Sequence, residues 1–147
     1  MKRTMMFAAV TILVLSFSVT GSRAQGYMDR TEDGKLVVAA AKFMMAQAQK
    51  LTSAKDIDRA WMVDDGHQLI KHGYNYMETS EMVFSDEGKV NLQEIGQKIL
   101  LVGQVLLKMG RQKGALTQKE NDEIKKQIEM LNGMGKLMLE KGQIMGG

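Results

Sequence analysis

Small residues recur at intervals of seven in every segment of this chain that shows a helical pattern of apolar side chains. The four series, each called a seam below, are Gly34/Ala41/Ala48, Gly66/Gly73/Ser80, Gly96/Gly103/Gly110 and Gly135/Gly142. A glycine inside a helix costs about 0.8–1 kcal/mol relative to alanine. The seven glycines of the last three seams therefore cost roughly 6–7 kcal/mol, which is comparable to the total stability of a domain, about 5–15 kcal/mol.

Close approach of helix backbones along a left-handed seam is the simplest compensation for this cost. A seam glycine can receive a large side chain of a neighbouring helix or let two backbones meet. We therefore expect seven glycines to be helix-packing positions: Gly66, Gly73, Gly96, Gly103, Gly110, Gly135 and Gly142.

Apolar spacing and capping signals predict four helices, over about 31–51, 57–84, 92–111 and 118–145. Residues 85–90 are expected to form a loop. Asn91 with Glu94 is expected to start the third helix, and Thr117 with Glu120 forms a capping box for the fourth. Because the connections are short, the helices are expected to be antiparallel neighbours. The predicted fold is an all-α, antiparallel four-helix bundle with small-residue seams.

The N-terminal residues 1–24 have the pattern of an export signal. Lys2 and Arg3 precede an uncharged apolar stretch over 5–19, and Ser22 and Ala24 are the small residues that a signal peptidase reads, so cleavage before Gln25 is expected. The stretch is shorter than the roughly 20 residues of a membrane span, an uncleaved anchor being the alternative. The predicted domain is 25–147, exported to the periplasm or secreted, with no membrane span in the mature chain.

Removal of this segment leaves 17 basic and 17 acidic side chains. A neutral chain offers no basic patch for nucleic acid and no polybasic stripe for a membrane surface. The sequence contains no cysteine, which excludes disulfides, thiolate nucleophiles and iron–sulfur clusters. No catalytic triad, phosphate-binding loop or two-carboxylate pair is apparent, and we expect no enzymatic activity.

Methionine is the residue type that most suggests a ligand. Met130, Met134 and Met138 recur every four residues on the predicted fourth helix, which brings their thioethers to adjacent turns. Thioethers suit Cu(I) or Ag(I), so a soft-metal site is one hypothesis. Flexible methionines also fill irregular gaps in a core, and the same spacing serves that purpose.

A b-type haem is a further alternative cofactor. His67 with a methionine of another helix could provide axial ligands, an arrangement similar to that of small exported bundles of the cytochrome b562 type. The final helix of this chain contains no histidine, so the similarity is one of architecture.

Two short segments resemble the Leu-Thr-x-x-Gln motif of the small periplasmic helical chaperones related to Spy and CpxP. They are Leu51-Thr52-Ser53-Ala54-Lys55 and Leu116-Thr117-Gln118-Lys119-Glu120, with Lys55 and Glu120 in place of the final glutamine. The resemblance covers ten residues and implies a periplasmic chaperone as another alternative. From the residues themselves, we expect an exported structural or interaction protein that acts through helix surfaces, with proteins as partners, a second copy of the chain among them.

Overall fold

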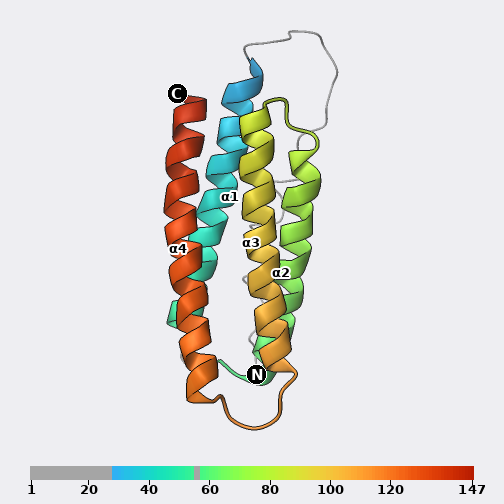
Figure 1. Ribbon diagram of the computed structural model, residues 1–147, viewed down its shortest axis with the longest axis vertical. Coiled ribbons are helices and arrows are strands. Elements are labelled where there is room, and N and C mark those ends of the chain that lie inside the picture. The colour runs from blue at the N-terminus through green and yellow to red at the C-terminus, as the bar shows by residue number, and fades with distance from the viewer. Residues whose placement is uncertain (1–27, 55–56) are drawn as a thin grey trace, which may run out of the picture.

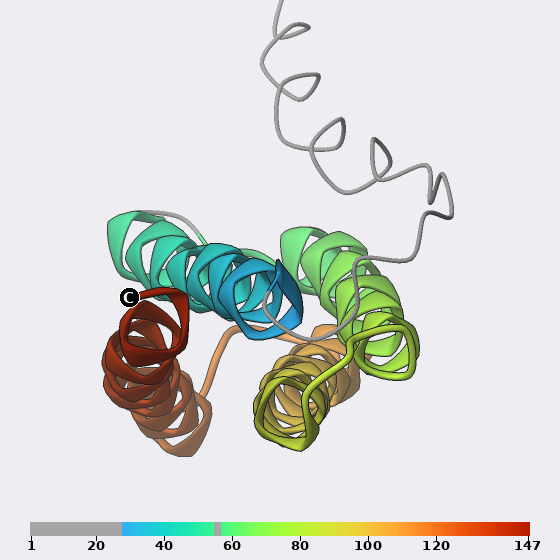
Figure 2. The same cartoon turned by 90° about the horizontal axis from the view of Figure 1, so that it is seen from above.

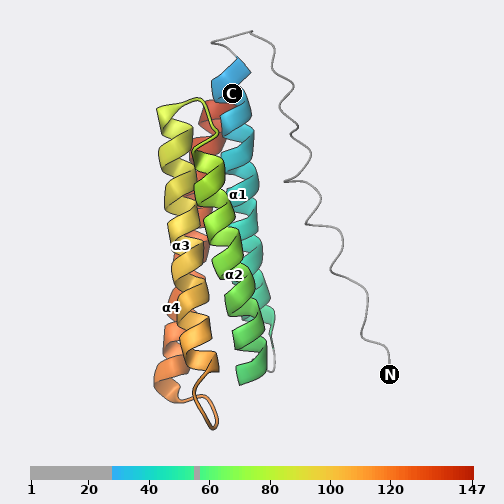
Figure 3. The same cartoon turned by 90° about the vertical axis from the view of Figure 1, so that its right-hand side faces the viewer.

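The computed structural model describes residues 28–54 and 57–147, and the expected signal peptide lies outside these residues. Four helices follow one another: α1 (Met28–Ser53), α2 (Arg59–Ser80), α3 (Asp86–Gly110) and α4 (Gln118–Gly146). They run alternately up and down along one long axis (Figure 1). The α2–α3 connection lies at one end, and the α3–α4 connection lies at the other, beside the end of α1 and the start of α2 (Figure 3). Over the described residues the chain is thus all-helical, with four helices packed as a bundle.

Side-chain caps fix the start of three helices. Asp58 accepts a hydrogen bond from the Trp61 N–H at the start of α2, and Ser85 accepts one from the Gly88 N–H at the start of α3. At the start of α4, Thr117 and Glu120 form the capping box that the sequence predicts. These bonds satisfy N–H groups that have no partner within the helix.

The expected loop over 85–90 is wrong, and so are the two helix ends beside it. α2 ends at Ser80 rather than at Phe84, and α3 begins six residues before the predicted start at 92. The reason is Asp33 of α1, whose carboxylate accepts hydrogen bonds from the Phe84 N–H (3.1 Å) and the Ser85 N–H (2.7 Å). This contact ends α2 early and sets Ser85 as the cap of α3.

Asn91 does not cap a helix but is buried inside α3. Its side-chain amide nitrogen lies 3.5 Å from the Met145 sulfur, and its amide oxygen accepts a hydrogen bond from Lys141 at 3.4 Å. Both partners belong to α4. Asn91 therefore ties α3 to α4 where the sequence pattern indicated a helix start.

The bundle consists of two closely packed helix pairs, α2 with α3 and α1 with α4, and contacts between other helices are far fewer. Viewed from the end, α2 and α4 occupy diagonally opposite corners (Figure 2). In the α2/α3 pair, a Cβ atom built on Gly66 would lie 2.8 Å from the Gly103 carbonyl oxygen, and one built on Gly73 would lie 2.7 Å from the Gly96 carbonyl oxygen. In both places the two backbones leave no room for a side chain.

The α1/α4 pair is built in the same way. A Cβ atom on Gly142 would lie 2.9 Å from the Gly34 carbonyl oxygen, and one on Gly135 would meet the Met45 side chain at 2.6 Å and the Ala41 carbonyl oxygen at 3.2 Å. The small residues of α1 and α4 thus lie against one another along the pair.

Both pairs follow one rule of contact. Each glycine lies against the backbone of the residue opposite and against the residue four positions farther along the partner helix. The resulting contacts are Gly66 with Leu107, Gly73 with Leu100, Gly96 with Met77, Gly103 with Ile70, Gly110 with Val63, and Gly142 with Val38. On α2 and α3, the glycines at 66, 73, 96 and 103 therefore act together with the large residue four places after each of them.

The interior between the two pairs is apolar. The largest side chains that are fully buried there come from all four helices: Met44, Met62, Leu69, Leu92, Ile95, Ile99, Leu106, Leu131 and Met138. On α2 the interior is filled by Met62 and Leu69, which lie beside the seam rather than in it. No helix in the described part of the chain has the length and apolar character needed to cross a bilayer.

Substitution at the Gly66/Gly103 contact tests the close approach. Gly103→Ala gains helix propensity worth about 1 kcal/mol, but its methyl group would meet two backbone atoms of α2 at 2.8 Å. Overpacking of this kind costs about 1–3 kcal/mol, and a rigid backbone places the cost at the upper end. We expect a net loss of stability, measured as a lower midpoint in urea unfolding.

Gly133→Ala is the matched control, because a Cβ atom there would have nothing within 4 Å. It should stabilise the fold by up to about 1 kcal/mol. An equal rise in the urea midpoint for both variants would show that Gly103 is not closely packed.

Candidate interaction surface

Several large apolar side chains remain exposed on the described surface. They are Tyr74, Met82, Phe84, Val90, Leu101, Leu137 and Ile144. Met82 and Phe84 lie in the α2–α3 connection, whereas the last three belong to α3 and α4. Exposed apolar side chains that gather on one face mark sites of interaction.

Leu137 and Ile144 lie on the same side of α4. This side is next to the contact between α4 and α3 and faces away from the core. Lys141 contacts Asn91 and so marks where α4 meets α3. At about 100° per residue, Leu137 and Ile144 lie about 40° and 60° from Lys141, both turned away from the buried Met138 and Met145. Leu137 is 47% exposed and Ile144 is 64% exposed.

The same side of α4 carries further residues at intervals of seven. Six residues define what is called below the outer face of α4: Lys126, Met130, Gly133, Leu137, Glu140 and Ile144. Met130 is half-buried and the other five are exposed. The outer face therefore combines apolar side chains, one glycine and two opposite charges.

Gly133 differs from the seam glycines in its surroundings. A Cβ atom built on it would meet nothing within 4 Å, whereas one on Gly135, two residues later, would contact α1. Helix α4 nevertheless continues through both residues. Gly133 thus leaves an open, shallow position in the middle of the outer face.

The buried or half-buried charged side chains at the two ends of the bundle are engaged in holding the fold. At one end Asp33 accepts hydrogen bonds from two backbone N–H groups and from the Ser85 hydroxyl, at 2.7 Å for the hydroxyl. At the other end Arg59 donates to both carboxylate oxygens of Glu120, at 2.7 and 3.0 Å. Arg59 also donates to the carbonyl oxygens of Met109, Gly114 and Ala115.

This hydrogen bonding fixes the ionised form of Glu120. The Arg59 guanidinium, with the Thr117 backbone N–H, holds the pKa of Glu120 at about 2, below its ordinary 4.5. The pair therefore fastens the α3–α4 connection to α2 at neutral pH.

A third polar group lies between α1 and α2. Lys50 forms an ion pair with the buried Asp65, and its ammonium lies 5.4 Å from the centre of the Trp61 ring. The second carboxylate oxygen of Asp65 is buried without a hydrogen-bond partner among the described residues. A charge in this position depends on Lys50.

Aromatic side chains continue this α1/α2 contact. The rings of Phe43 and His72 lie 4.6 Å apart, and Phe43 and Tyr76 lie 5.8 Å apart. Burial lowers the pKa of His72 below 6.5, with the Lys71 charge adding to the effect, and burial raises the pKa of Tyr76 to about 12. Both side chains are therefore neutral at pH 7 and pack as part of the helix contact.

The predicted metal ligands differ in their exposure to solvent. Met138 is fully buried in the core, Met130 and Met134 are half-buried, and His67 is exposed on α2. His67 belongs to α2 and the methionines to α4, and these two helices lie at diagonally opposite corners of the bundle (Figure 2). Within residues 28–54 and 57–147, no group of three or more His, Asp or Glu side chains is placed to hold a metal ion.

The two segments similar to the chaperone motif lie at the same end of the bundle. Leu51 is buried and Leu116 is half-buried against the core, while Thr117 and Glu120 make the cap of α4. Lys55 lies outside the described residues.

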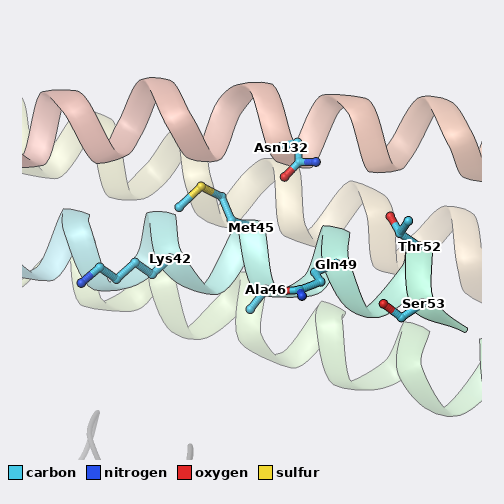
Figure 4. A pocket seen from close by; sticks show the side chains of 7 residues that line it. All are labelled: Lys42, Met45, Ala46, Gln49, Thr52, Ser53 and Asn132. Carbon is cyan, nitrogen blue, oxygen red and sulfur yellow. The ribbon is translucent and has the colours of Figure 1, made fainter.

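A shallow depression of about 520 Å³ runs beside the α1/α4 pair. Figure 4 shows the side chains that line it, six from α1 and Asn132 from α4. Met45, one of the six, is the residue that covers Gly135. Lys42 is the one charged residue among the seven that line the depression.

Comparison of the chain with known protein families, with curated proteins and with solved structures finds no match. Leu137 and Ile144 were not predicted as surface residues. The repeat of Met130, Leu137 and Ile144 at intervals of seven is the signal that could have revealed the outer face.

Replacement of Lys50 tests the ion pair. Lys50→Met leaves the Asp65 carboxylate buried without a counter-charge and should lower the free energy of unfolding by about 2 kcal/mol. This is less than for a fully buried pair, because the Lys50 side chain is 34% exposed. Asp65→Leu should cost less, since the Lys50 ammonium can then turn to water. Urea unfolding of both variants measures the asymmetry, and a larger loss for Asp65→Leu would contradict it.

The pH dependence of Glu120 gives a second test. Because its pKa in the folded chain is about 2, below its ordinary value, the ion pair stabilises the fold above about pH 4.5 and this contribution disappears as the pH falls towards 2. Glu120→Gln keeps the capping geometry but removes the charge. We expect it to unfold more readily than the parent at pH 7, with the difference closing in acid.

The control for this experiment is Glu129→Gln, which removes one exposed charge from the same helix. A difference between Glu120→Gln and the parent that stays constant from pH 7 to about pH 2 would exclude the ion pair as its cause.

Proposed function

We propose that this chain is an exported, non-enzymatic helical bundle that serves as a structural or interaction protein, and that it acts through the outer face of α4. The observation that supports this most directly is the exposure of Leu137 and Ile144 on one side of a helix whose other side is packed in the core. An apolar face of this kind gains free energy when a partner removes it from water.

The use of the buried polar groups agrees with this proposal. Asp33, Arg59 and Asn91 each bond to backbone or side-chain atoms of another helix or connection. Their hydrogen bonds hold helix ends and helix pairs in place, which is a structural use. A rigid bundle suits a protein that presents a surface, because a rigid surface loses little conformational entropy on binding.

Export is proposed on the sequence pattern of residues 1–24. The neutral charge of residues 25–147 favours protein partners over nucleic acid or anionic membranes.

Site-specific photo-crosslinking in cells that produce the full chain tests the proposal. A photoreactive amino acid at position 137 or 144 should give adducts of discrete mass, because both positions lie on the outer face. The same amino acid at Gln68, exposed on α2, is the control and should give few adducts.

A second variant keeps this test specific. Leu137→Lys should reduce the adducts formed from position 144, since it places a charge in the apolar contact. Equal adduct levels from positions 68, 137 and 144 would remove the basis for an interaction surface on α4.

A further inference from the structure

Around Gly133, the outer face of α4 repeats part of the arrangement that joins the helices within the molecule, namely one glycine with a large residue four places after it. The positions seven residues before and after Gly133 are Lys126 and Glu140, where the seams have small residues. In the α2/α3 pair, Gly66 with Ile70 and Gly103 with Leu107 face each other, and each glycine contacts the large residue that follows its counterpart by four. On the outer face, Leu137 follows Gly133 by the same four residues. Met130 and Ile144 continue the large positions at intervals of seven, as Val63 and Met77 do around Ile70.

Gly133 has a cost that the single chain does not explain. Glycine within a helix is unfavourable relative to alanine, and the seam glycines offset this by admitting a neighbouring backbone. No neighbouring backbone packs against Gly133 in the described structure, and Leu137, four residues later, is 47% exposed. A helix from outside the chain that packs here would supply the missing contact and cover Leu137.

We propose that this helix is α4 of a second copy of the chain, packed antiparallel about a two-fold axis at Gly133. Gly133 of each copy then faces Gly133 of the other. Leu137 of each copy covers Gly133 of the other, because it lies four residues after the glycine that is opposite, as in the pairs within the molecule. This inference rests on the proposed function, because it names the partner of the same surface.

The charges on the outer face favour a second copy of α4 as the partner and favour its antiparallel orientation. Lys126 lies seven residues before Gly133 and Glu140 lies seven after it. An antiparallel second copy places Lys126 opposite Glu140 of the second copy, and the two-fold axis makes this pair twice. A parallel copy would place like charges opposite each other, which is repulsive.

Neither charge is already paired within the described part of the chain. Among residues 28–54 and 57–147, Lys126 and Glu140 take part in no ion pair, although Lys125 next to Lys126 lies 3.9 Å from Asp122. The two side chains are exposed and face away from the core. They are therefore available for the intermolecular pairs.

A contact made by one helix from each copy buries less surface than a standard protein interface, and such small contacts are weak. We therefore expect a monomer–dimer equilibrium that is observed over about 10 µM to 1 mM protein. Sedimentation equilibrium of the purified full-length product measures it directly. The average mass should rise from that of one chain towards that of two.

Gly133→Gln separates dimerisation from folding. The longer side chain blocks close approach of a second helix, but it points into open space in the monomer. We expect the dimer dissociation constant to rise about tenfold or more, with the helical signal and the unfolding midpoint unchanged or higher. Unaltered association in this variant would overturn the proposal.

Charge reversal tests the antiparallel register. Lys126→Glu and Glu140→Lys should each weaken the dimer, because each places like charges opposite each other. The double variant should restore association close to the parent value. Lys71→Glu, an exposed reversal on α2, is the control and should have no effect, and failure of the double variant to restore association would overturn the register.

A chain that stays monomeric up to about 1 mM would overturn the second copy as partner. If position 137 still forms crosslinks to a different protein in cells, the proposed function stands and only this inference fails. If crosslinks from positions 137 and 144 are also absent, both fail.

Discussion

The structure depends on the close approach of helix backbones at glycine. In each helix pair, the backbone of one helix occupies the space that a Cβ atom of the other would need, as at Gly66 and Gly103. Only a residue without a side chain allows this distance. Glycine lowers helix propensity, so the helices are held by their contacts with each other rather than by intrinsic preference. The interval of seven keeps these positions on one side of each helix over several turns.

This packing determines which of the remaining side chains lie between the helices of a pair, which fill the core and which join the two pairs. In the α2/α3 pair, Ile70, Met77, Leu100 and Leu107 lie four places after a glycine and pack against the partner helix. Another set, including Met62 and Leu69, fills the space between the pairs. Polar contacts fasten the pairs to each other, with Asp33 at one end, Arg59 and Glu120 at the other, and Lys50 with Asp65 between α1 and α2. The outer face of α4 carries one glycine, Gly133, with Leu137 four places after it, and neither has a helix packed against it in the described chain.

The four helices and their order could be predicted from apolar spacing and capping residues, because both are local signals. The start of α3 could not, since it depends on Asp33, which contacts Ser85 from more than fifty positions earlier in the chain. For the same reason the sequence indicated Asn91 as a cap, although its partners on α4 place it inside a helix. The ion pair of Lys50 and Asp65 was equally hidden, because charged residues on a helix are usually exposed.

The candidate surface was only partly visible in the sequence. Gly135 lies seven residues before Gly142, and this interval predicts it as a packing position; α1 packs against it in the structure. No local pattern says what lies beside Gly133, and the fold leaves that position open. Leu137 and Ile144 are exposed because of the way α4 is turned about its own axis when it packs against α1. No local sequence pattern predicts this orientation.

Nuclear Overhauser contacts between glycine α-protons measure the close approach most directly. Protein labelled with ¹³C at glycine should show cross-peaks between the α-protons of Gly66 and Gly103 and between those of Gly73 and Gly96, because these backbones touch. Absence of both cross-peaks, in a protein whose helices give normal amide signals, would mean that the pairs are held apart by side chains and that glycine does not join them.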